Sequence, residues 1–170
     1  RLGAGAAAQA EIAALQARGV SVTVHQGDIA DEADVAALMA QLHTSAAPLA
    51  GIVHAAGALA DAVLTRQDWS HFETVMAAKV RGSWNLHRLA GELDFLVFFS
   101  SGASVGGSAG QANHAAANAF EDALAWHRNA RGQPTLSINW GPWAEIGAAA
   151  DRRLAQPGGL RPIAPADGIA

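Results

Sequence analysis

Residues 95–99 form a continuous apolar run, Phe-Leu-Val-Phe-Phe, which is followed directly by Ser100 and Ser101. A run of this length and composition is typical of a parallel strand that is covered on both faces. Four glycines between residues 102 and 110 then allow a tight crossing, and the alanine-rich residues 112–130 have strong helical propensity. The stretch predicts a strand–loop–helix unit whose serine pair lies at the carboxyl end of the strand, where open α/β sheets bind ligands.

Two polar residues of the predicted helix, His114 and Asn118, are four positions apart. Residues at this spacing lie on one face of a helix. A polar pair that faces a serine at a strand end is an arrangement expected of an active site.

The rest of the chain alternates between helical and strand-like patterns. We expect helices over about 6–18, 31–42, 68–90 and 112–130, and strands over 20–27, 51–57, 95–100 and 134–140. The apolar face of the helix over 68–90 is expected to comprise Trp69, Phe72, Val75, Met76, Val80, Trp84 and Leu86. This alternation predicts an α/β fold with a parallel sheet and right-handed crossovers. The glycine- and proline-rich last twenty residues predict a mobile surface segment.

Composition excludes several classes of protein. The 170 residues are 51% hydrophobic and only 15% charged, with a net charge of −4, which is unlike a nucleic-acid-binding domain or one that binds an anionic membrane. Zero cysteines exclude disulfides, a zinc ribbon and a thiol nucleophile, and we assign no metal ligands. No signal peptide or membrane span is predicted, so a cytoplasmic protein is expected.

Five blocks of sequence together resemble the short-chain dehydrogenase/reductase family, and within it the ketoreductase domain of type I modular polyketide synthases. The blocks are HAAG at 54–57, AAKV at 77–80, FSS at 99–101, the GSAGQAN–AAANAF–DALA frame at 107–125 and SINWGPWAEIG at 137–147. They agree in order and spacing, and the resemblance covers essentially all 170 residues.

The resemblance implies a Rossmann-like doubly wound parallel sheet, in which the strand order is 3-2-1-4-5-6. Residues 20–25 would be the third strand and residues 51–54 the fourth, although these two are not neighbours in that order. We therefore expect residues 1–170 to be the C-terminal part of one NADPH-binding ketoreductase domain, a fragment lacking the first two strands and the last strand. Its catalytic core would span about 51–147, and its lid and tail about 144–170.

By the same resemblance, the catalytic residues are Lys79, Ser101, His114 and Asn118. Ser101 would hydrogen-bond the substrate oxygen, while Asn118 and Lys79 would order a water and tune the proton donor. The family's catalytic tyrosine falls on His114, and the chain contains no tyrosine. Three outcomes are open: His114 is a substitute acid, reduction is slow, or the domain only binds its cofactor. A nearby Lys79 cation is expected to lower the pKa of His114.

The resemblance also implies an NADPH site. Arg1 would meet the 2′-phosphate, and Asp28 would bind the adenine edge, although Asp28 also reads as a residue that initiates a helix. The pattern Gly3-Ala-Gly5-Ala-Ala-Ala8 lacks a preceding strand, so we interpret it as a loop before a helix rather than a pyrophosphate loop. The remaining residues assigned to the cofactor are Ile29, His54, Ala55, Ala56, Gly57, Ser100, Gly141, Pro142 and Trp143. Trp143 is equally well interpreted as a core aromatic residue.

Substrate selection is assigned to Leu59, Asp61 and Gln111. Leu59-Ala60-Asp61 resembles the Leu-Asp-Asp signature of B-type ketoreductases but lacks the middle aspartate. The tryptophan that marks A-type domains would fall at Gly106.

The leading hypothesis is therefore reduction of the β-keto group of an acyl-carrier-protein-bound polyketide intermediate by NADPH, with B-type stereochemistry, next to other polyketide synthase domains. The alternative is a catalytically weak or inactive module that binds cofactor or has a structural role. A relative of sugar-nucleotide epimerases is disfavoured, because Asn118 occupies the position where that class has lysine.

Overall fold

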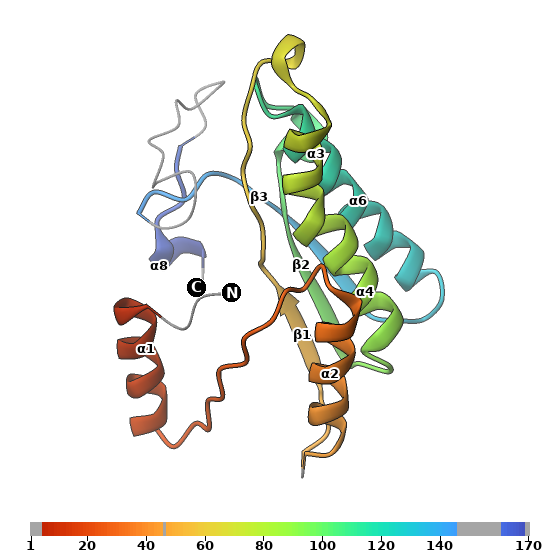
Figure 1. The fold of residues 1–170 in the computed structure, drawn as a ribbon. Helices are drawn as coiled ribbons and strands as arrows, with labels where there is room; N and C mark the ends of the chain where they lie inside the picture. The colour runs from red at the N-terminus through yellow and green to blue at the C-terminus, as the bar shows by residue number, and fades with distance from the viewer. Residues whose placement is uncertain (1–4, 46, 146–160, 169–170) are drawn as a thin grey trace.

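The computed structural model describes residues 5–45, 47–145 and 161–168, in which helices pack against a three-stranded parallel sheet (Figure 1). The strands are β1 (Gly51–His54), β2 (Phe95–Ser101) and β3 (Thr135–Trp140). The helices are α1 (Ala6–Ala17), α2 (Glu32–His43), α3 (Trp69–Met76), α4 (Ser83–Leu89), α5 (Ala103–Gly106), α6 (Ala112–Asn129) and α8 (Pro165–Gly168). Two further segments are the 3₁₀ turn η1 (Leu64–Arg66) and the π-helical η2 (Ala77–Gly82).

The sheet has the order β1-β2-β3, and both pairings are parallel. The strands predicted near 51, 95 and 134 are thus confirmed. Alternate side chains of β2 are buried: Leu96, Phe98 and Ser100 point toward the helices. Because the strands are parallel and adjacent, their carboxyl ends meet at one edge, and Ser101 lies there opposite Trp140.

Two apolar clusters hold the helices against the sheet. In one, Leu124 and Ala125 of α6 pack on Leu96 and Phe98 of β2. The other joins α2 to α4 through Val35, Met39, Leu86 and Ala90, with Ile52 of β1 packed against it. Burial of these side chains is the main force that orients α4 and α6 over the strands.

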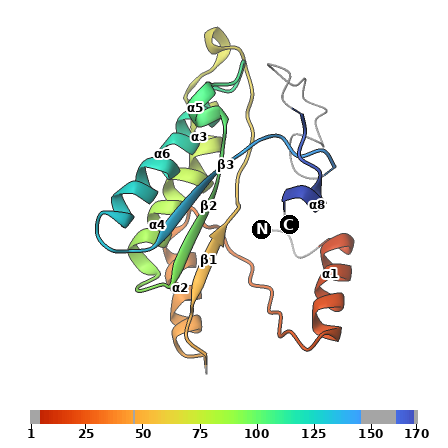
Figure 2. The same ribbon diagram turned by 180° about the vertical axis from the view of Figure 1, so that it is seen from behind.

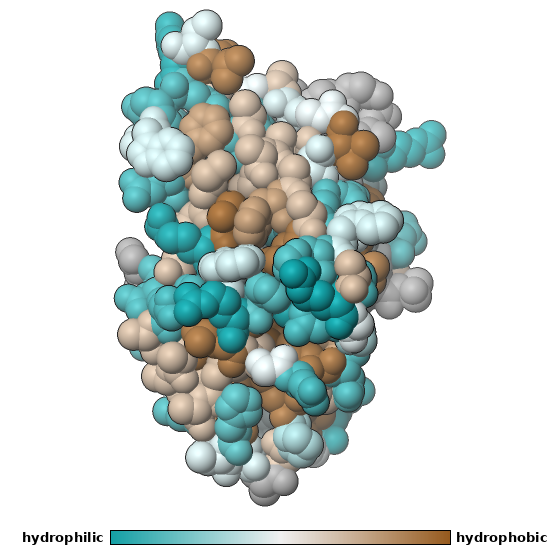
Figure 3. Space-filling model, turned by 90° about the vertical axis from the view of Figure 1, so that its right-hand side faces the viewer, coloured by the Kyte–Doolittle hydropathy of each residue, from teal (hydrophilic) through white to brown (hydrophobic). Residues whose placement is uncertain are grey.

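The helices α2, α3, α4 and α6 lie on one side of the sheet, and α1 and α8 lie on the other (Figures 1 and 2). Helix α1 buries none of its residues. On the α1 side of the sheet, Val53, Phe95 and Leu136 are each about half exposed. The outer face of the helical layer mixes hydrophilic and hydrophobic residues, with hydrophilic ones prominent across its middle (Figure 3). None of the described helices is both long and apolar enough to cross a membrane.

Polar caps explain where two helices begin. Asp31, the predicted N-cap, accepts hydrogen bonds from the backbone N–H groups of Ala33 and Asp34 at the start of α2. Asp68 caps α3 in the same way, and its capping box is completed by the side chain of His71.

The predicted strand over 20–27 is wrong, since these residues pair with no strand in the described part of the chain. Val20 and Val24 are exposed there. Their alternation with polar residues is that of a strand, but a strand also requires a neighbour to bond with, and no described segment lies beside them in a ladder.

The predicted helix over 68–90 is interrupted, because the π-helical η2 separates α3 from α4. Val75 and Leu86 are buried as expected, but Trp69 and Trp84 are exposed, so they do not belong to the buried face. The additional residue per turn in η2 changes the helical phase, and a fixed 3.6-residue period cannot follow that change.

Three short helical segments of the described chain, η1, α5 and α8, were not predicted. The four-residue α5 follows β2 directly. In the tail, Ile163 forms an isolated bridge with Trp143, and α8 follows it. The part of the tail that the structure describes is therefore paired with the loop after β3. Most of the predicted lid, residues 146–160, lies outside the described residues.

Candidate active site

Lys79 and Glu121 form a buried ion pair beneath the carboxyl ends of the strands. Lys79 lies in η2, and its Nζ donates to Oε2 of Glu121 at 2.9 Å and to the carbonyl of Phe99 at 2.8 Å. Glu121 lies on α6 with its side chain fully buried. Its other oxygen, Oε1, accepts from the Ser83 hydroxyl at 3.1 Å and lies 3.5 Å from Nε2 of His54. This network connects three elements around one carboxyl group.

Burial shifts the pKa values in this network. Burial raises the pKa of Glu121, while Lys79 and Ser83 oppose the rise. Burial and the Lys79 cation lower the pKa of His54 to about 4, against a hydrogen bond to the carbonyl of Ala78. His54 is therefore neutral at physiological pH.

His114 and Asn118 share one face of α6, as predicted. The Asn118 amide donates to the carbonyl of His114 at 2.8 Å and lies 3.2 Å from Nε2 of the imidazole. With Nε2 as the acceptor, the proton of the neutral ring is assigned to Nδ1. Both Nδ1 of His114 and Oδ1 of Asn118 are buried and lack a hydrogen-bond partner among the described residues. Such orphaned polar atoms are typical of a site that binds water or substrate.

The pKa of His114 is lowered, first by burial and then by the Lys79 cation, although Asp61 opposes the shift. The predicted influence of Lys79 on His114 is thus present. The two side chains are not hydrogen-bonded to each other, because the Lys79 ammonium donates to Glu121 and to the carbonyl of Phe99.

Ser101 ends β2, where its hydroxyl accepts from the backbone N–H of Ala103 at 3.2 Å. Its neighbour Ser100 points the other way and donates to the carbonyl of Asn118 at 3.3 Å. The carboxylate of Asp122 accepts hydrogen bonds from the side chains of Ser104, Ser137 and Asn139 near the carboxyl ends of β2 and β3. Burial raises the pKa of Asp122, but these hydrogen bonds outweigh burial and lower it.

The loop after β1 is fastened to the start of α6. Nδ2 of Asn113 donates to the carbonyls of Ala60 and His71, at 2.8 and 3.0 Å. Gln111 donates to the Asp61 carboxylate at 3.2 Å. Two residues predicted to select substrate, Asp61 and Gln111, are therefore in contact beside His114.

A cleft of about 420 Å³ lies between the turn before α2 and the loop after β1. Its lining residues are mostly small: Gly27, Asp28, Ile29, Ala56, Gly57, Ala58, Thr74, Ala77 and Ala78. Asp28 accepts from the N–H of Ala30 at 3.0 Å, so it also shapes the turn that precedes α2. The Asn85 side chain donates to the carbonyl of Ile29 and ties this turn to α4.

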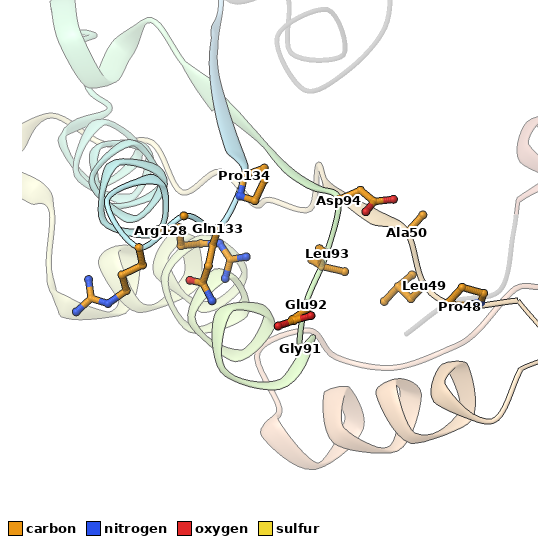
Figure 4. Close-up of a pocket in the computed structure, with 12 residues that line it drawn as sticks. Pro48, Leu49, Ala50, Gly91, Glu92, Leu93, Asp94, Arg128, Gln133 and Pro134 are labelled. Carbon is orange, nitrogen blue, oxygen red and sulfur yellow. The ribbon is translucent and has the colours of Figure 1, made fainter.

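A second pocket, of about 640 Å³, opens at the other end of the sheet (Figure 4). It is lined by the segments that precede the three strands, including Pro48, Glu92 and Pro134, together with Arg128 and Arg131. None of the predicted catalytic residues lines it. Although it is the larger pocket, it lies away from the polar cluster and has no part in the site.

The model of the KR domain family matches residues 1–145. This chain belongs to that family. The ketoreductase matches parts of long polyketide synthases: it is 44% identical over 141 residues to the lovastatin diketide synthase mokB of Monascus pilosus, covering 82% of this chain and 6% of that one. It is 49% identical over 129 residues to polyketide synthase GfsE of Streptomyces halstedii, covering 75% and 3%.

Another relative is a type I phenolphthiocerol synthesis polyketide synthase of Mycobacterium tuberculosis, whose name includes the word "inactive". It is 43% identical over 178 residues, and the match covers 99% of this chain and 11% of that protein. Among solved structures, an A1-type ketoreductase superposes with a TM-score of 0.89 at 39% identity, and the match covers 98% of this chain and 36% of that one. The ketoreductase is thus similar to part of each relative, and its Rossmann-like fold is shared with solved ketoreductases.

The cleft is lined by several of the residues that the resemblance assigns to the cofactor. Small residues at Ala56, Gly57 and Ala58 let a ligand approach the backbone closely, and Asp28 and Ile29 line the same cleft. The structure places His54 and Ser100 elsewhere, in buried contacts with Glu121 and with the carbonyl of Asn118. Gly141, Pro142 and Trp143 follow β3, where Trp143 packs 4.9 Å from the ring of Trp140. Arg1 lies outside the described residues.

Sequence reasoning missed Glu121 and Ser83. Glu121 continues the stripe of α6 that contains Ala117, Leu124 and Ala125, all of them buried. A carboxylate next to buried apolar residues of a helix signals a buried partner, and the only lysine of the chain, Lys79, was available to be that partner.

We expect the ion pair to make the two residues strongly interdependent. Replacing Glu121 with Leu leaves the Lys79 ammonium buried without a counter-ion and should lower the free energy of unfolding by about 3–5 kcal/mol. Lys79→Met together with Glu121→Leu should recover most of this loss, since an apolar pair of similar volume needs no counter-ion. Urea unfolding of the single and double variants measures the coupling. The expected coupling would be contradicted if the double variant lost as much unfolding free energy as the two single variants lose together.

His54 should make the protein less stable in acid. Its pKa is depressed in the folded state, so the unfolded state binds a proton first and stability falls as pH drops from 6.5 to about 4. Protonation of Glu121 has the opposite effect on stability, because the pKa of this carboxyl is raised in the folded state. The contribution of His54 must therefore be measured as the difference between the wild-type protein and His54→Gln. Relative to His54→Gln, the wild-type protein should lose about 3 kcal/mol across this window. Urea unfolding at several pH values tests this, with the exposed His25→Gln as control; parallel curves for wild type and His54→Gln would contradict it.

Proposed function

We propose that this chain reduces the β-keto group of an acyl-carrier-protein-bound polyketide intermediate, using NADPH and His114 as the proton donor. The observation that carries the proposal is the unpartnered Nδ1 of His114 at the carboxyl end of the sheet. Ser101 ends the central strand on one side of this point, and Asn118 and Lys79 complete the set that the family resemblance implies. Neighbouring polyketide synthase domains would supply the tethered substrate.

Asp28, Ile29, Ala56 and Gly57 would hold NADPH along the cleft, and the cofactor would supply the hydride for the carbonyl carbon. The residues of the chain act on the oxygen, where negative charge develops as the C=O π-bond becomes a C–O single bond. The Ser101 hydroxyl and the Nδ1–H of His114 would both donate hydrogen bonds to that oxygen. In the imidazolium form, which carries a proton on each ring nitrogen, His114 would give its Nδ1 proton to the alkoxide, which leaves the alcohol and a neutral ring that keeps its proton on Nε2. Fixed donors need no reorganisation as this charge appears.

The histidine changes the pH dependence of the reaction. Because the pKa of His114 is lowered from 6.5, the imidazolium is a minor species at neutral pH. Its fraction grows as pH falls, so the rate of proton donation should rise below pH 6.5.

The alternative is a cofactor-binding or structural module with little turnover. It is favoured by the same lowered pKa, which leaves few molecules with an acid at position 114. The two proposals differ in whether substrate is turned over.

NADPH oxidation with a β-ketoacyl thioester, followed by the absorbance of the reduced nicotinamide, decides between them. We expect turnover by the wild-type enzyme that rises toward low pH, and His114→Phe should lose about 10²–10⁴-fold by removing the acid. Ser101→Ala should lose about 10²-fold or more by removing an oxyanion donor. His114→Tyr should remain active and lose the acid-side rise. A silent wild-type enzyme that is activated by His114→Tyr would identify a retired reductase, and silence in both would support the structural module.

We also propose a B-type hydroxyl configuration. Asp61 is the aspartate that this chain retains from the Leu-Asp-Asp signature of B-type domains, and its carboxylate accepts a hydrogen bond from Gln111. By the family resemblance, the tryptophan of A-type domains falls at Gly106. Chiral chromatography of the reduced thioester should show B-type product, and Asp61→Ala should lower the enantiomeric excess. The opposite alcohol from the wild-type enzyme would overturn this assignment.

A further inference from the structure

The buried face of α6 that carries His114 and Asn118 continues to Glu121. The three residues follow the spacing i, i+4, i+7, so they lie on one stripe of the helix. Seven residues correspond to about 10 Å along a helix axis. Glu121 therefore places a carboxylate about two turns beyond His114, on the same side and deeper in the core.

This carboxylate determines where the Lys79 ammonium lies. Two of the ammonium's N–H groups bond to Glu121 and to the carbonyl of Phe99, and the lysine is only 5% exposed. Another acceptor, Oδ1 of Asn118, is buried without a partner and is one turn closer to His114 along the helix. The ammonium thus bonds to Glu121 and not to the acceptor on α6 that is closer to His114.

A histidine and a tyrosine need opposite electrostatic surroundings. A nearby cation stabilises a tyrosinate and so favours proton release, but it destabilises an imidazolium. Lys79 acts on His114 in this unfavourable sense. A carboxylate that binds the lysine reduces its effect, since an ion pair has no net charge.

We propose that Glu121 is a positioning residue: its carboxylate holds the Lys79 ammonium back from His114 and neutralises it, so that the site can use an imidazole as its acid. This inference rests on the proposed function, and it identifies the residue that adapts the site to histidine. Glu121 would act through Lys79 and would not touch substrate.

Several titratable or polar groups face Glu121. Lys79 faces it from η2, His54 from β1, and Asp122 adjoins it on α6, while Ser83 of α4 donates a hydrogen bond. Burial raises the pKa of Glu121, whereas the Lys79 ammonium and the Ser83 hydroxyl favour its charged form. The ion pair with Lys79 and the hydrogen bond from Ser83 therefore support the carboxylate form on which the proposal depends.

The test measures the pKa of His114 itself in the full-length synthase. Deuterium exchange at the imidazole C2 position, read by mass spectrometry of the peptide that contains His114, reports this pKa without any turnover. Glu121→Gln keeps the shape of the side chain and removes its charge. It should lower the pKa of His114 by about one unit, since the lysine is then an uncompensated cation. The control Glu73→Gln, which removes a carboxylate from the exposed pair with Arg81, should cause no shift.

A second substitution tests whether Glu121 acts through the lysine. Adding Lys79→Met to Glu121→Gln should return the pKa of His114 to near its wild-type value. An unchanged or raised pKa of His114 in Glu121→Gln would overturn the proposal. It would also be overturned if Glu121→Gln lowered the pKa of His114 by the same amount in a protein that already carries Lys79→Met. If Glu121→Gln does not fold, Lys79→Met and the double variant are compared instead; equal pKa values support the proposal and different ones overturn it.

Activity is a separate readout that distinguishes this proposal from the proposed function. In an active enzyme, Glu121→Gln should lower kcat at neutral pH with little change in the KM for NADPH, and its acid-side rise should shift to lower pH. If no variant turns over, the proposed function fails while the exchange measurement still decides the role of Glu121. A loss of kcat with an unshifted pH profile and an unshifted His114 pKa would indicate a merely structural effect and overturn the proposal.

Discussion

A buried ion pair, Lys79 with Glu121, joins the helical layer to the central strand. The desolvation of two charges is expensive, and a buried pair is tolerated only when further hydrogen bonds satisfy both groups. Here the Lys79 ammonium donates a further hydrogen bond to the carbonyl of Phe99, and the Glu121 carboxylate accepts one from the Ser83 hydroxyl. The pair therefore links η2, β2, α4 and α6 at one point, and the positions of the site residues depend on that link.

The elements that carry the buried ion pair also carry residues of the candidate site. The π-helical turn that carries Lys79 lines the cleft next to the loop after β1 through Ala77 and Ala78. The same helix α6 carries Glu121 in the core and His114 at the end of the sheet. Under the role proposed for Glu121, a change in the charge of the core pair would alter the pKa of His114. This gives a physical reason why a family that relies on a tyrosine acid can accommodate a weakly basic ring at that place.

Much of the fold was readable from local pattern. The strand over 95–100, the helix over 112–130 and the cap at Asp31 were predicted from apolar runs, propensity and capping chemistry, and the structure confirms them. The strand expected over 20–27 was wrong, because alternation describes one strand whereas a ladder requires two. The π-helical interruption at η2 was missed, since a single additional residue in one turn leaves no signal in a periodic pattern.

The sequence by itself determined which residue types stand at each place: a serine at a strand end, a histidine and an asparagine one turn apart, and a single lysine. The assignment of His114 to a tyrosine position came from family resemblance, because spacing alone cannot distinguish an acid from a core histidine. Only the tertiary structure decided that Lys79 pairs with Glu121, 42 positions away, and that His54 turns into the core. Contacts of this kind depend on how helices pack over the sheet, and packing is a property of the whole chain rather than of any local segment.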